Sequence, residues 1–242
     1  MLNIKDFESK VLRVNQETTE IKSFQFSVPD DFSFKPAQHV VLELHVDGKK
    51  QMKSFSISSS PSRKGYIETT KRIGPSEYSK VMGSLKEGDV VRIKGPYGLF
   101  LLNEEKDAVM IAGGIGITPF KDMIEYASEK VLPIKITLLF SNKTPEDIPF
   151  KEELDELDRN NSDLKIIHTI TRPHQNKEEW DGLTGHINEE MIRKEVESFE
   201  GKVFYVCGPP SMVNEVVAIL EKMQIPKEQI KIERFTGYDG EE

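Results

Sequence analysis

The sequence has little cysteine and no histidine cluster, and these absences narrow the possible chemistry. Cys207 is the one cysteine among 242 residues, so the chain can form no internal disulfide, no cysteine-ligated iron–sulfur cluster and no four-cysteine zinc site. The five histidines form no HxxxH or HxH pair. We therefore expect no metal site, and any redox centre must be organic.

Long apolar runs are also missing. The longest nearly uninterrupted one, residues 109–117, includes three glycines and falls far short of the ~20 residues that cross a bilayer. The N-terminus lacks the basic-then-apolar build of a secretory signal. We expect a cytoplasmic protein without membrane insertion. The remaining composition, 37% hydrophobic and 31% charged, is that of an ordinary globular protein, and no nucleic-acid partner is expected.

Charge is distributed unevenly along the chain. Residues 1–100 carry 16 Lys and Arg against 12 Asp and Glu, a net charge of +4, whereas residues 101–242 carry 17 against 29, a net charge of −12. This asymmetry favours two domains with different partners, although solvated helix surface is the ordinary source of an acidic excess. The length also suits two domains, each with its own core.

Up to about Lys94 the sequence consists of short β-rich runs separated by turn residues. Closely spaced strands joined by turns such as Asp47-Gly48 and Gly88-Asp89 predict an antiparallel barrel. One helix, near residues 76–82, interrupts them. The strands are expected at residues 10–14, 21–26, 40–45, 54–58, 66–70 and 90–94.

After the charged segment 103–107, strands alternate with amphipathic helices, which predicts a parallel, doubly wound sheet. The predicted fold class is therefore two domains: an N-terminal antiparallel β-barrel over residues 1–101, and an α/β domain with a Rossmann-like parallel sheet over residues 102–242. In the second domain strands are expected at 108–112, 134–140, 164–170, 203–206 and 230–232, and helices at 119–130, 150–157, 188–199 and 211–223.

The clearest chemical signal is a glycine-rich turn between an expected buried strand and a helix, Ala112-Gly113-Gly114-Ile115-Gly116-Ile117-Thr118-Pro119. Glycines let a phosphate approach the backbone, Thr118 can cap the helix, and Pro119 suits its first turn. The spacing departs from the GxGxxG dinucleotide fingerprint, and there is no P-loop lysine. The turn therefore predicts a phosphate site, with a purely structural turn as the alternative.

Three weaker motifs accompany this turn. In Lys53-Ser54-Phe55-Ser56 a cation and an aromatic ring share a strand face and could serve one ligand, although alternating Ser and Phe is ordinary in sheets. Gly95-Pro96-Tyr97-Gly98 indicates a tight turn. Cys207 ends a parallel strand, at the edge where open α/β sheets bind ligands, although a lone buried cysteine is usually inert.

In order and spacing, these motifs together with Gly74-Pro75-Ser76 and Glu233-Arg234-Phe235 resemble the ferredoxin-NADP reductase superfamily over nearly the whole chain. The resemblance is greatest to the compact NAD(P)H:ferredoxin or oxygenase reductases without a fused iron–sulfur domain. It implies a barrel that binds FAD, an α/β domain that binds NAD(P)H, and an active site between them.

On the barrel, the resemblance implies that Lys53 holds the FAD pyrophosphate, Phe55 stacks on the flavin, and Ser56 hydrogen-bonds near its N5. Lysine here replaces the family's usual arginine, which removes a bidentate fork, and Ala37 stands where the family commonly has glycine. The implied FAD-binding residues are Lys53, Ser54, Phe55, Ser56, Thr69, Thr70, Lys71, Gly74, Pro75 and Ser76.

In the α/β domain, the resemblance implies that the glycine turn binds the pyrophosphate of NAD(P)H and that Cys207 orients the nicotinamide. Phe235 would cover the flavin, or Tyr238 in the following tail would serve instead. NADPH is expected, with NADH possible, because Lys143 and Arg172 fall where the family reads the ribose, although both also suit solvated loops. The implied catalytic residues are Ser56, Cys207, Glu233 and Phe235, and the implied nucleotide-binding residues are Gly113, Gly114, Gly116, Thr118, Pro119, Ser141, Lys143, Thr171, Arg172, Cys207, Gly208, Pro209 and Phe235.

The resemblance implies hydride transfer between NAD(P)H and FAD, with single electrons passing to or from a separate carrier such as an acidic ferredoxin or flavodoxin. Lys49, Lys50, Arg63 and Lys64 are candidate docking charges on the basic half. A free flavin or quinone reductase would share every motif. The motifs are also compatible with an electron-transfer subunit of a larger complex and with a non-enzymatic flavin- or nucleotide-sensing module.

Overall fold

The computed structural model describes residues 4–175 and 179–235, and the chain divides into two compact units. The first consists of the described residues up to 102 together with Lys121–Glu129, and the second of residues 103–120 and the described residues from 130 onward. Each unit has its own sheet and apolar core. The domain boundary between residues 101 and 102 stays a prediction. The middle of helix α2 (Thr118–Lys130) belongs with the first unit.

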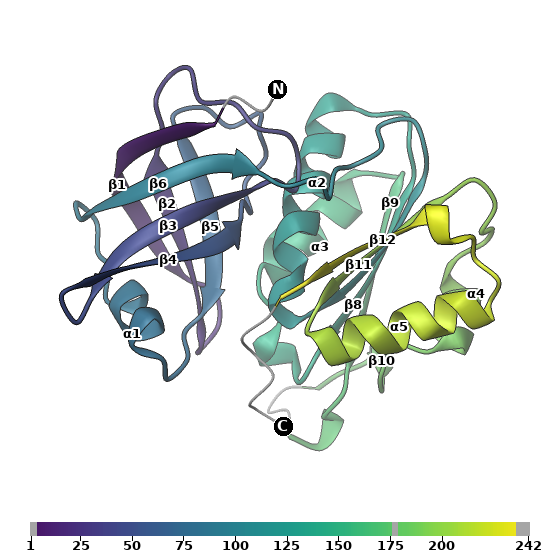
Figure 1. Ribbon diagram of the computed structural model, residues 1–242. Coiled ribbons are helices and arrows are strands. Elements are labelled where there is room, and N and C mark those ends of the chain that lie inside the picture. The colour runs from purple at the N-terminus through teal and green to yellow at the C-terminus, as the bar shows by residue number, and fades with distance from the viewer. Residues whose placement is uncertain (1–3, 176–178, 236–242) are drawn as a thin grey trace. The chain divides into compact units, whose positions relative to one another are not determined.

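The first unit is a six-stranded antiparallel sheet with the order β4-β3-β6-β1-β2-β5. The sheet curls on itself (Figure 1), and a bridge between Ile57 and Thr69 joins the two edges. This confirms the fold class predicted for the first half. The strands are β1 (Lys5–Gln16), β2 (Ile21–Ser27), β3 (His39–Val46), β4 (Lys49–Ser56), β5 (Tyr66–Arg72) and β6 (Val90–Tyr97).

The core of the first unit follows from strand alternation. In β3 every second side chain is buried inside the curled sheet, and Phe24 and Phe26 of β2 are fully buried in the same core. Helix α1 (Glu77–Gly83) packs against β3, and its buried Tyr78 donates a hydrogen bond from its hydroxyl to Leu42 O at 3.0 Å. Ser76 caps this helix by accepting from Ser79 N. These contacts fix α1 beside β3.

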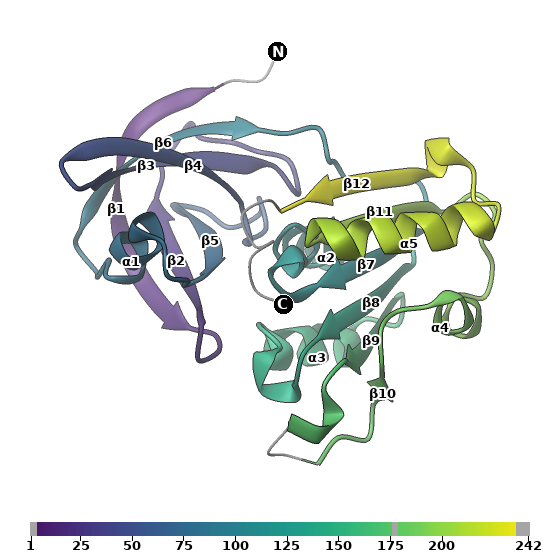
Figure 2. The ribbon, with the colours of Figure 1, turned by 60° about the horizontal axis from the view of Figure 1, so that its bottom comes forward.

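The second unit is a six-stranded parallel sheet with the order β10-β9-β8-β7-β11-β12. Every residue of β7 and β11 is buried, as expected for central strands covered on both faces. Figure 2 shows α4 and α5 on one face and α3 on the other. The strands are β7 (Ala108–Gly113), β8 (Ile136–Asn142), β9 (Leu164–Ile170), β10 (Leu183–Thr184), β11 (Val203–Gly208) and β12 (Ile230–Arg234), and the helices are α3 (Lys151–Asn160), α4 (Glu189–Glu195) and α5 (Pro210–Lys222).

The strand order changes direction at β7, because β8 and β9 follow on one side of it and β11 and β12 on the other. Open α/β sheets bind ligands outside the carboxyl ends of the strands at such a switch point. Gly113 ends β7 and Gly208 ends β11. The parallel, doubly wound sheet predicted for the second half is confirmed, and its switch point lies between these two glycines.

Several local predictions differ from the structure, and the strand expected at 54–58 runs from Lys49 to Ser56. The helix expected at 188–199 ends at Glu195, because Val196 is extended at φ −110° and ψ 110°. The strand expected at 134–140 runs from Ile136 to Asn142. The two-residue strand β10 has no counterpart among the predicted strands, since it is too short for any periodicity to appear.

Candidate functional site

The predicted pair on β4 does share one face. Both side chains meet Tyr78 of α1: the Lys53 Nζ atom lies 5.2 Å from the ring centroid, and the Phe55 ring stacks on it at 6.1 Å and 19°. Lys53 is exposed, Phe55 half-buried and Ser56 buried. Burial therefore increases along β4, from the Lys53 ammonium through the Phe55 ring to the Ser56 hydroxyl. This gradient suits a ligand with a charged end and a planar aromatic end.

A second cation lies near Lys53. Burial lowers the pKa of Lys71 on β5 to about 8, and the positive charge of Lys53 contributes to that lowering. The Lys71 ammonium donates to Arg72 O at 3.1 Å. A bound anion would stabilise the ammonium groups of Lys53 and Lys71, because it would offset the repulsion between them and replace the water that Lys71 loses on burial. The two lysines therefore fit a phosphate-containing ligand such as the FAD pyrophosphate.

The remaining predicted FAD residues lie on β5 and in the turn that follows it. Thr69 and Thr70 are buried; Thr70 Oγ1 is hydrogen-bonded to Ser58 and Ser23, whereas Thr69 Oγ1 has no partner among the described residues. In the turn, Gly74 N donates to Ser79 Oγ, and a Cβ at Gly74 would meet nothing within 4 Å. The backbone at Gly74 is therefore open, just after β5, the strand that carries Lys71. Pro75, Ser76 and Ser54 are exposed.

In the second unit the predicted glycine turn is itself helical. Gly114 to Ile117 form a 3₁₀ turn that runs directly into α2. The expectation that Thr118 caps this helix is wrong: Thr118 already lies within α2, and its hydroxyl donates to Ile115 O at 3.1 Å. Pro119 does occupy the first turn of the helix. The continuous 3₁₀ and α segments remove the need for a side-chain cap.

The glycines of this turn have distinct roles. A Cβ at Gly116 would lie 2.4 Å from Cys207 O and 2.7 Å from Gly208 Cα, so only glycine lets the turn pack against the end of β11. Gly114 has a left-handed φ of +52° and open space around its Cβ position. Its backbone can therefore be approached closely by a ligand. This open, glycine-lined edge fits a nucleotide pyrophosphate.

Cys207, Glu233 and Phe235 lie at the same edge. Cys207 and Glu233 are register partners on β11 and β12, and Phe235 N donates to Gly208 O at 3.0 Å. Burial raises the pKa of the Cys207 thiol well above its usual range and raises that of Glu233 to about 7. Glu233 Oε2 is buried without a hydrogen-bond partner among the described residues. The Glu233 carboxyl is therefore poised to change protonation near neutral pH.

The predicted ribose readers lie further along this edge. Gly113 and Ser141 are register partners, and Thr171 N and Arg172 N donate to Asn142 O and Lys143 O. The sheet therefore brings the predicted nucleotide residues of the second unit to one edge. Lys143 is half-buried and Arg172 exposed.

Sequence reasoning missed two residues at this edge. The amide of Asn142 is buried, and both its side-chain atoms lack partners within the described part of the chain. Met212 of α5 fills the space that side chains at Gly113 and Gly208 would take; its Sδ lies 2.2 Å from the Cβ position of Gly113. Burial identifies Asn142, and contact with the two glycines identifies Met212; no pattern in the sequence signals either residue. Tyr238 lies outside the described residues.

Metal-ligand clusters and membrane-spanning helices are both missing from the described part of the chain. Across residues 4–175 and 179–235, no cluster of three or more His, Cys, Asp or Glu is arranged to hold a metal ion. None of the helices described in those ranges is long and apolar enough to cross a membrane.

Two family models match the chain in order. Residues 8–101 match the oxidoreductase FAD-binding domain, and residues 110–218 match the oxidoreductase NAD-binding domain. Among curated proteins, the glycine betaine monooxygenase reductase subunit of Pseudomonas aeruginosa is 32% identical over 88% of this chain. The chain spans only 59% of that relative's length. NADH-cytochrome b5 reductase 1 of Aspergillus clavatus is 30% identical to this chain, and the match covers 94% of this chain and 78% of the relative's length.

Solved structures share the fold over most of the chain. A ferredoxin NADP+ reductase from Neisseria gonorrhoeae with bound FAD and NADP has a TM-score of 0.82 at 23% identity, covering 95% of this chain and 98% of its own. A cytochrome P450 reductase from Amycolatopsis has a TM-score of 0.85 at 20% identity, covering 98% of this chain and 72% of its own. At these identities the likeness concerns the fold alone.

Proposed function

The chain belongs to the ferredoxin-NADP reductase superfamily, and on that premise we propose that it is a flavoprotein reductase that takes hydride from NAD(P)H onto FAD and passes single electrons to a separate carrier protein. The observation that carries the proposal is the glycine-lined edge where Gly116 packs against Cys207 and Gly208. It lies at the switch point of a parallel sheet and leaves Gly114 open to a ligand.

Bound FAD would supply the conversion of a two-electron hydride into single electrons. Lys53 and Lys71 would hold its pyrophosphate, because both are cations whose mutual repulsion an anion would offset. Phe55 would contact the flavin ring, and the buried Ser56 would hydrogen-bond near N5. The barrel residues would thus bind and orient FAD, and the cofactor would supply the redox chemistry.

In the second unit, the glycine turn would bind the nucleotide pyrophosphate. Cys207 would orient the nicotinamide as a small packing group, because burial keeps its thiol protonated and unsuited to attack. Glu233 would hold a proton near the nicotinamide, and Phe235 would cover the flavin until nicotinamide displaces it. We propose NADPH as the preferred donor, since Lys143 and Arg172 are available to a 2'-phosphate.

An absorbance spectrum of the purified protein, before and after anaerobic addition of NADPH or NADH, tests the proposal. Flavin bands are expected, and they should bleach at a lower concentration of NADPH than of NADH. A protein that stays colourless after incubation with FAD would contradict the reductase function and favour a sensing module. Equal bleaching by both nucleotides would refute only the NADPH preference.

Removing the charge of Lys53 is expected to weaken FAD binding. Lys53→Met should raise the dissociation constant for FAD about tenfold, the loss of one charge-assisted phosphate contact, as measured by flavin fluorescence. Lys53→Arg should bind at least as tightly as the wild type, because guanidinium contacts phosphate bidentately. Lys49→Met, on the same face of β4, is the control. If Lys53→Met and Lys49→Met bind FAD with equal affinity, Lys53 does not contact the FAD pyrophosphate.

Carrier docking is proposed to use a smaller set of charges than the sequence indicated. Lys50 is paired with Glu43 at 2.8 Å and Arg63 with Glu129 at 3.1 Å, whereas no ion pair to a described residue involves the exposed Lys49 or Lys64. The Lys49→Glu/Lys64→Glu variant should raise the KM for an acidic carrier severalfold at low salt, and the difference from wild type should vanish at high salt. Steady-state carrier reduction measures this. A salt-independent KM in the wild type would argue against electrostatic docking.

A further inference from the structure

Helix α2 buries charged side chains, which is unusual for a helix of a globular protein. Its apolar residues Phe120, Met123 and Ile124 are fully buried. Lys121, Asp122 and Glu125 are only 4%, 0% and 8% exposed. Charged side chains are rarely buried without partners, because the loss of hydration costs several kcal/mol per ion. The charges of Lys121 and Glu125 must therefore be satisfied by the residues packed on them. Asp122 differs, because burial raises the pKa of its carboxyl and its Oδ1 atom has no hydrogen-bond partner among the described residues.

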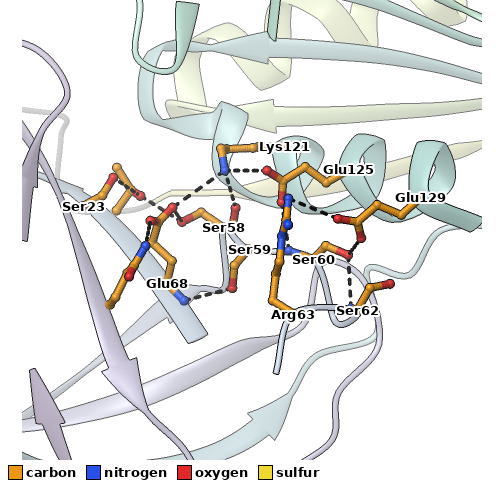
Figure 3. A network of polar contacts seen from close by, with 12 residues as sticks. Ser23, Ser58, Ser59, Ser60, Ser62, Arg63, Glu68, Lys121, Glu125 and Glu129 are labelled. Carbon is orange, nitrogen blue, oxygen red and sulfur yellow. Dashed lines mark hydrogen bonds and ion pairs between the residues drawn. The ribbon is translucent and has the colours of Figure 1, made fainter. Parts of the chain in front are cut away.

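Two of these partners, Ser58 and Ser60, belong to one short stretch of the first unit (Figure 3). Lys121 Nζ donates to Ser58 O at 3.2 Å and to Glu125 Oε1 at 2.9 Å. Glu125 Oε2 accepts from Ser60 N at 3.0 Å. Glu68 of β5 lies 3.8 Å from Lys121 and also accepts from the Ser58 hydroxyl. The helix thus holds the main chain on both sides of Ser59.

A second contact of α2 reaches the neighbouring turn. Asp122 Oδ2 accepts from Ala37 N at 2.8 Å, and Ala37 has a left-handed φ of 64°. The next residue, Gln38, accepts through its main-chain oxygen from Ile57 N at 3.0 Å. Ile57 directly follows Ser56, the buried hydroxyl at the end of β4. Two chains of hydrogen bonds therefore lead from α2 to the residues beside Ser56.

We propose that Lys121 and Glu125 are positioning residues for FAD: they fix the main chain of Ser58–Ser60 and thereby hold Phe55 and Ser56 in place for the flavin. This inference rests on the proposed function. Neither side chain is assigned a contact with a ligand. Their effect passes through the main chain, because Ser58 is only two residues from Ser56 and the intervening Ile57 is itself hydrogen-bonded to Gln38.

Two variants remove this support in different ways. Lys121→Met leaves Ser58 O without its donor and leaves Glu125 and Glu68 without their shared cation. Glu125→Met removes the acceptor of Ser60 N while Lys121 keeps Ser58 and Glu68. Lys121→Arg retains the charge and should recover most of the wild-type behaviour. Lys130→Met, at the exposed end of the same helix, is the matched control.

The first readout uses the 242-residue chain without FAD. Hydrogen–deuterium exchange of the peptide that covers residues 55–62 should be about tenfold faster in Lys121→Met and Glu125→Met, because local opening competes with these hydrogen bonds. Peptides from β1 and β6 should exchange as in the wild type. The second readout is the dissociation constant for FAD, which should rise about tenfold, with an altered visible circular dichroism of the bound flavin. The KM for NAD(P)H should stay unchanged while kcat falls.

The outcomes separate this inference from the proposed function. Variants that keep wild-type exchange over residues 55–62, or wild-type FAD affinity, would overturn it. Exchange that rises equally in every strand of the barrel would also overturn it, because that result indicates a general stabilising role. If the wild type binds no FAD, the proposed function fails with its dependent inference. If the wild type binds FAD and both variants bind it equally well, only the positioning role fails.

Discussion

Replacing Gly116 with alanine is expected to lower kcat/KM for the nicotinamide nucleotide by at least about a hundredfold, a loss of some 2.7 kcal/mol of transition-state binding. The added Cβ would lie 2.4 Å from Cys207 O and 2.6 Å from Cys207 C. Main-chain atoms cannot move aside as the end of a flexible side chain can, so the turn and the end of β11 must separate. That movement displaces both the glycine turn and Cys207. Stopped-flow reduction of the bound flavin measures the effect.

Gly114→Ala is the matched comparison. Gly114 has a left-handed φ of +52°, and no atom lies within 4 Å of its Cβ position. Alanine there would strain the backbone but would not collide with another part of the protein. The backbone strain costs about 1 kcal/mol, which corresponds to a loss of about fivefold; a larger loss would show that the added Cβ meets the bound nucleotide. Far-ultraviolet circular dichroism of both variants controls for folding. A wild-type kcat/KM for Gly116→Ala would mean that contact with β11 does not require glycine at position 116.

Glu233→Gln is expected to stabilise the protein at alkaline pH by up to about 3 kcal/mol relative to wild type. Burial raises the pKa of Glu233 from 4.5 to about 7 in the folded protein. Between these values the unfolded chain has released its proton while the folded protein retains it, so wild-type stability falls as the pH rises. Above about 7 both states are ionised and the loss is complete. Glutamine cannot ionise and avoids this loss.

Thermal unfolding from pH 4.5 to 8 tests this prediction. The midpoint of Glu233→Gln should rise relative to wild type with increasing pH and reach a constant difference above pH 7. Placing an amide beside Cys207 can also lower the unfolding midpoint. That effect is the same at every pH, so it shifts the whole Glu233→Gln curve of midpoint against pH without changing its shape. Glu228→Gln, which replaces an exposed carboxylate just before β12, is the control variant. A parallel displacement of the Glu233→Gln and wild-type curves would show that Glu233 titrates normally.

The sequence was informative where a local pattern and the final environment agree. Closely spaced β-rich runs joined by turns predicted the curled antiparallel sheet, and strands alternating with amphipathic helices predicted the parallel sheet. The alternation in β4 also placed Lys53 and Phe55 on one face, where Tyr78 now meets both. These features depend on neighbours within a few residues, which a single sequence contains.

Other features depend on partners far away in the chain. Lys121, Asp122 and Glu125 look like the solvated face of an amphipathic helix, because nothing near them in sequence shows that a serine-rich stretch some 60 residues earlier covers them. Ala37 is a similar case. Its left-handed backbone would ordinarily require glycine, and the hydrogen bond from its N–H to buried Asp122 is a long-range contact.

The packing of Lys121–Glu129 with the barrel has a consequence for modular recombination. A hybrid reductase joined at residue 102, where the chain passes from one sheet to the other, would inherit the barrel's serine-rich stretch without the helix residues that complement it. Ser58 O, Ser60 N and Ala37 N would then face a foreign helix. Recombined genes should therefore tolerate exchange of the segment after residue 130 more readily than exchange at 102, provided that residues 121–129 travel with the barrel that they fit.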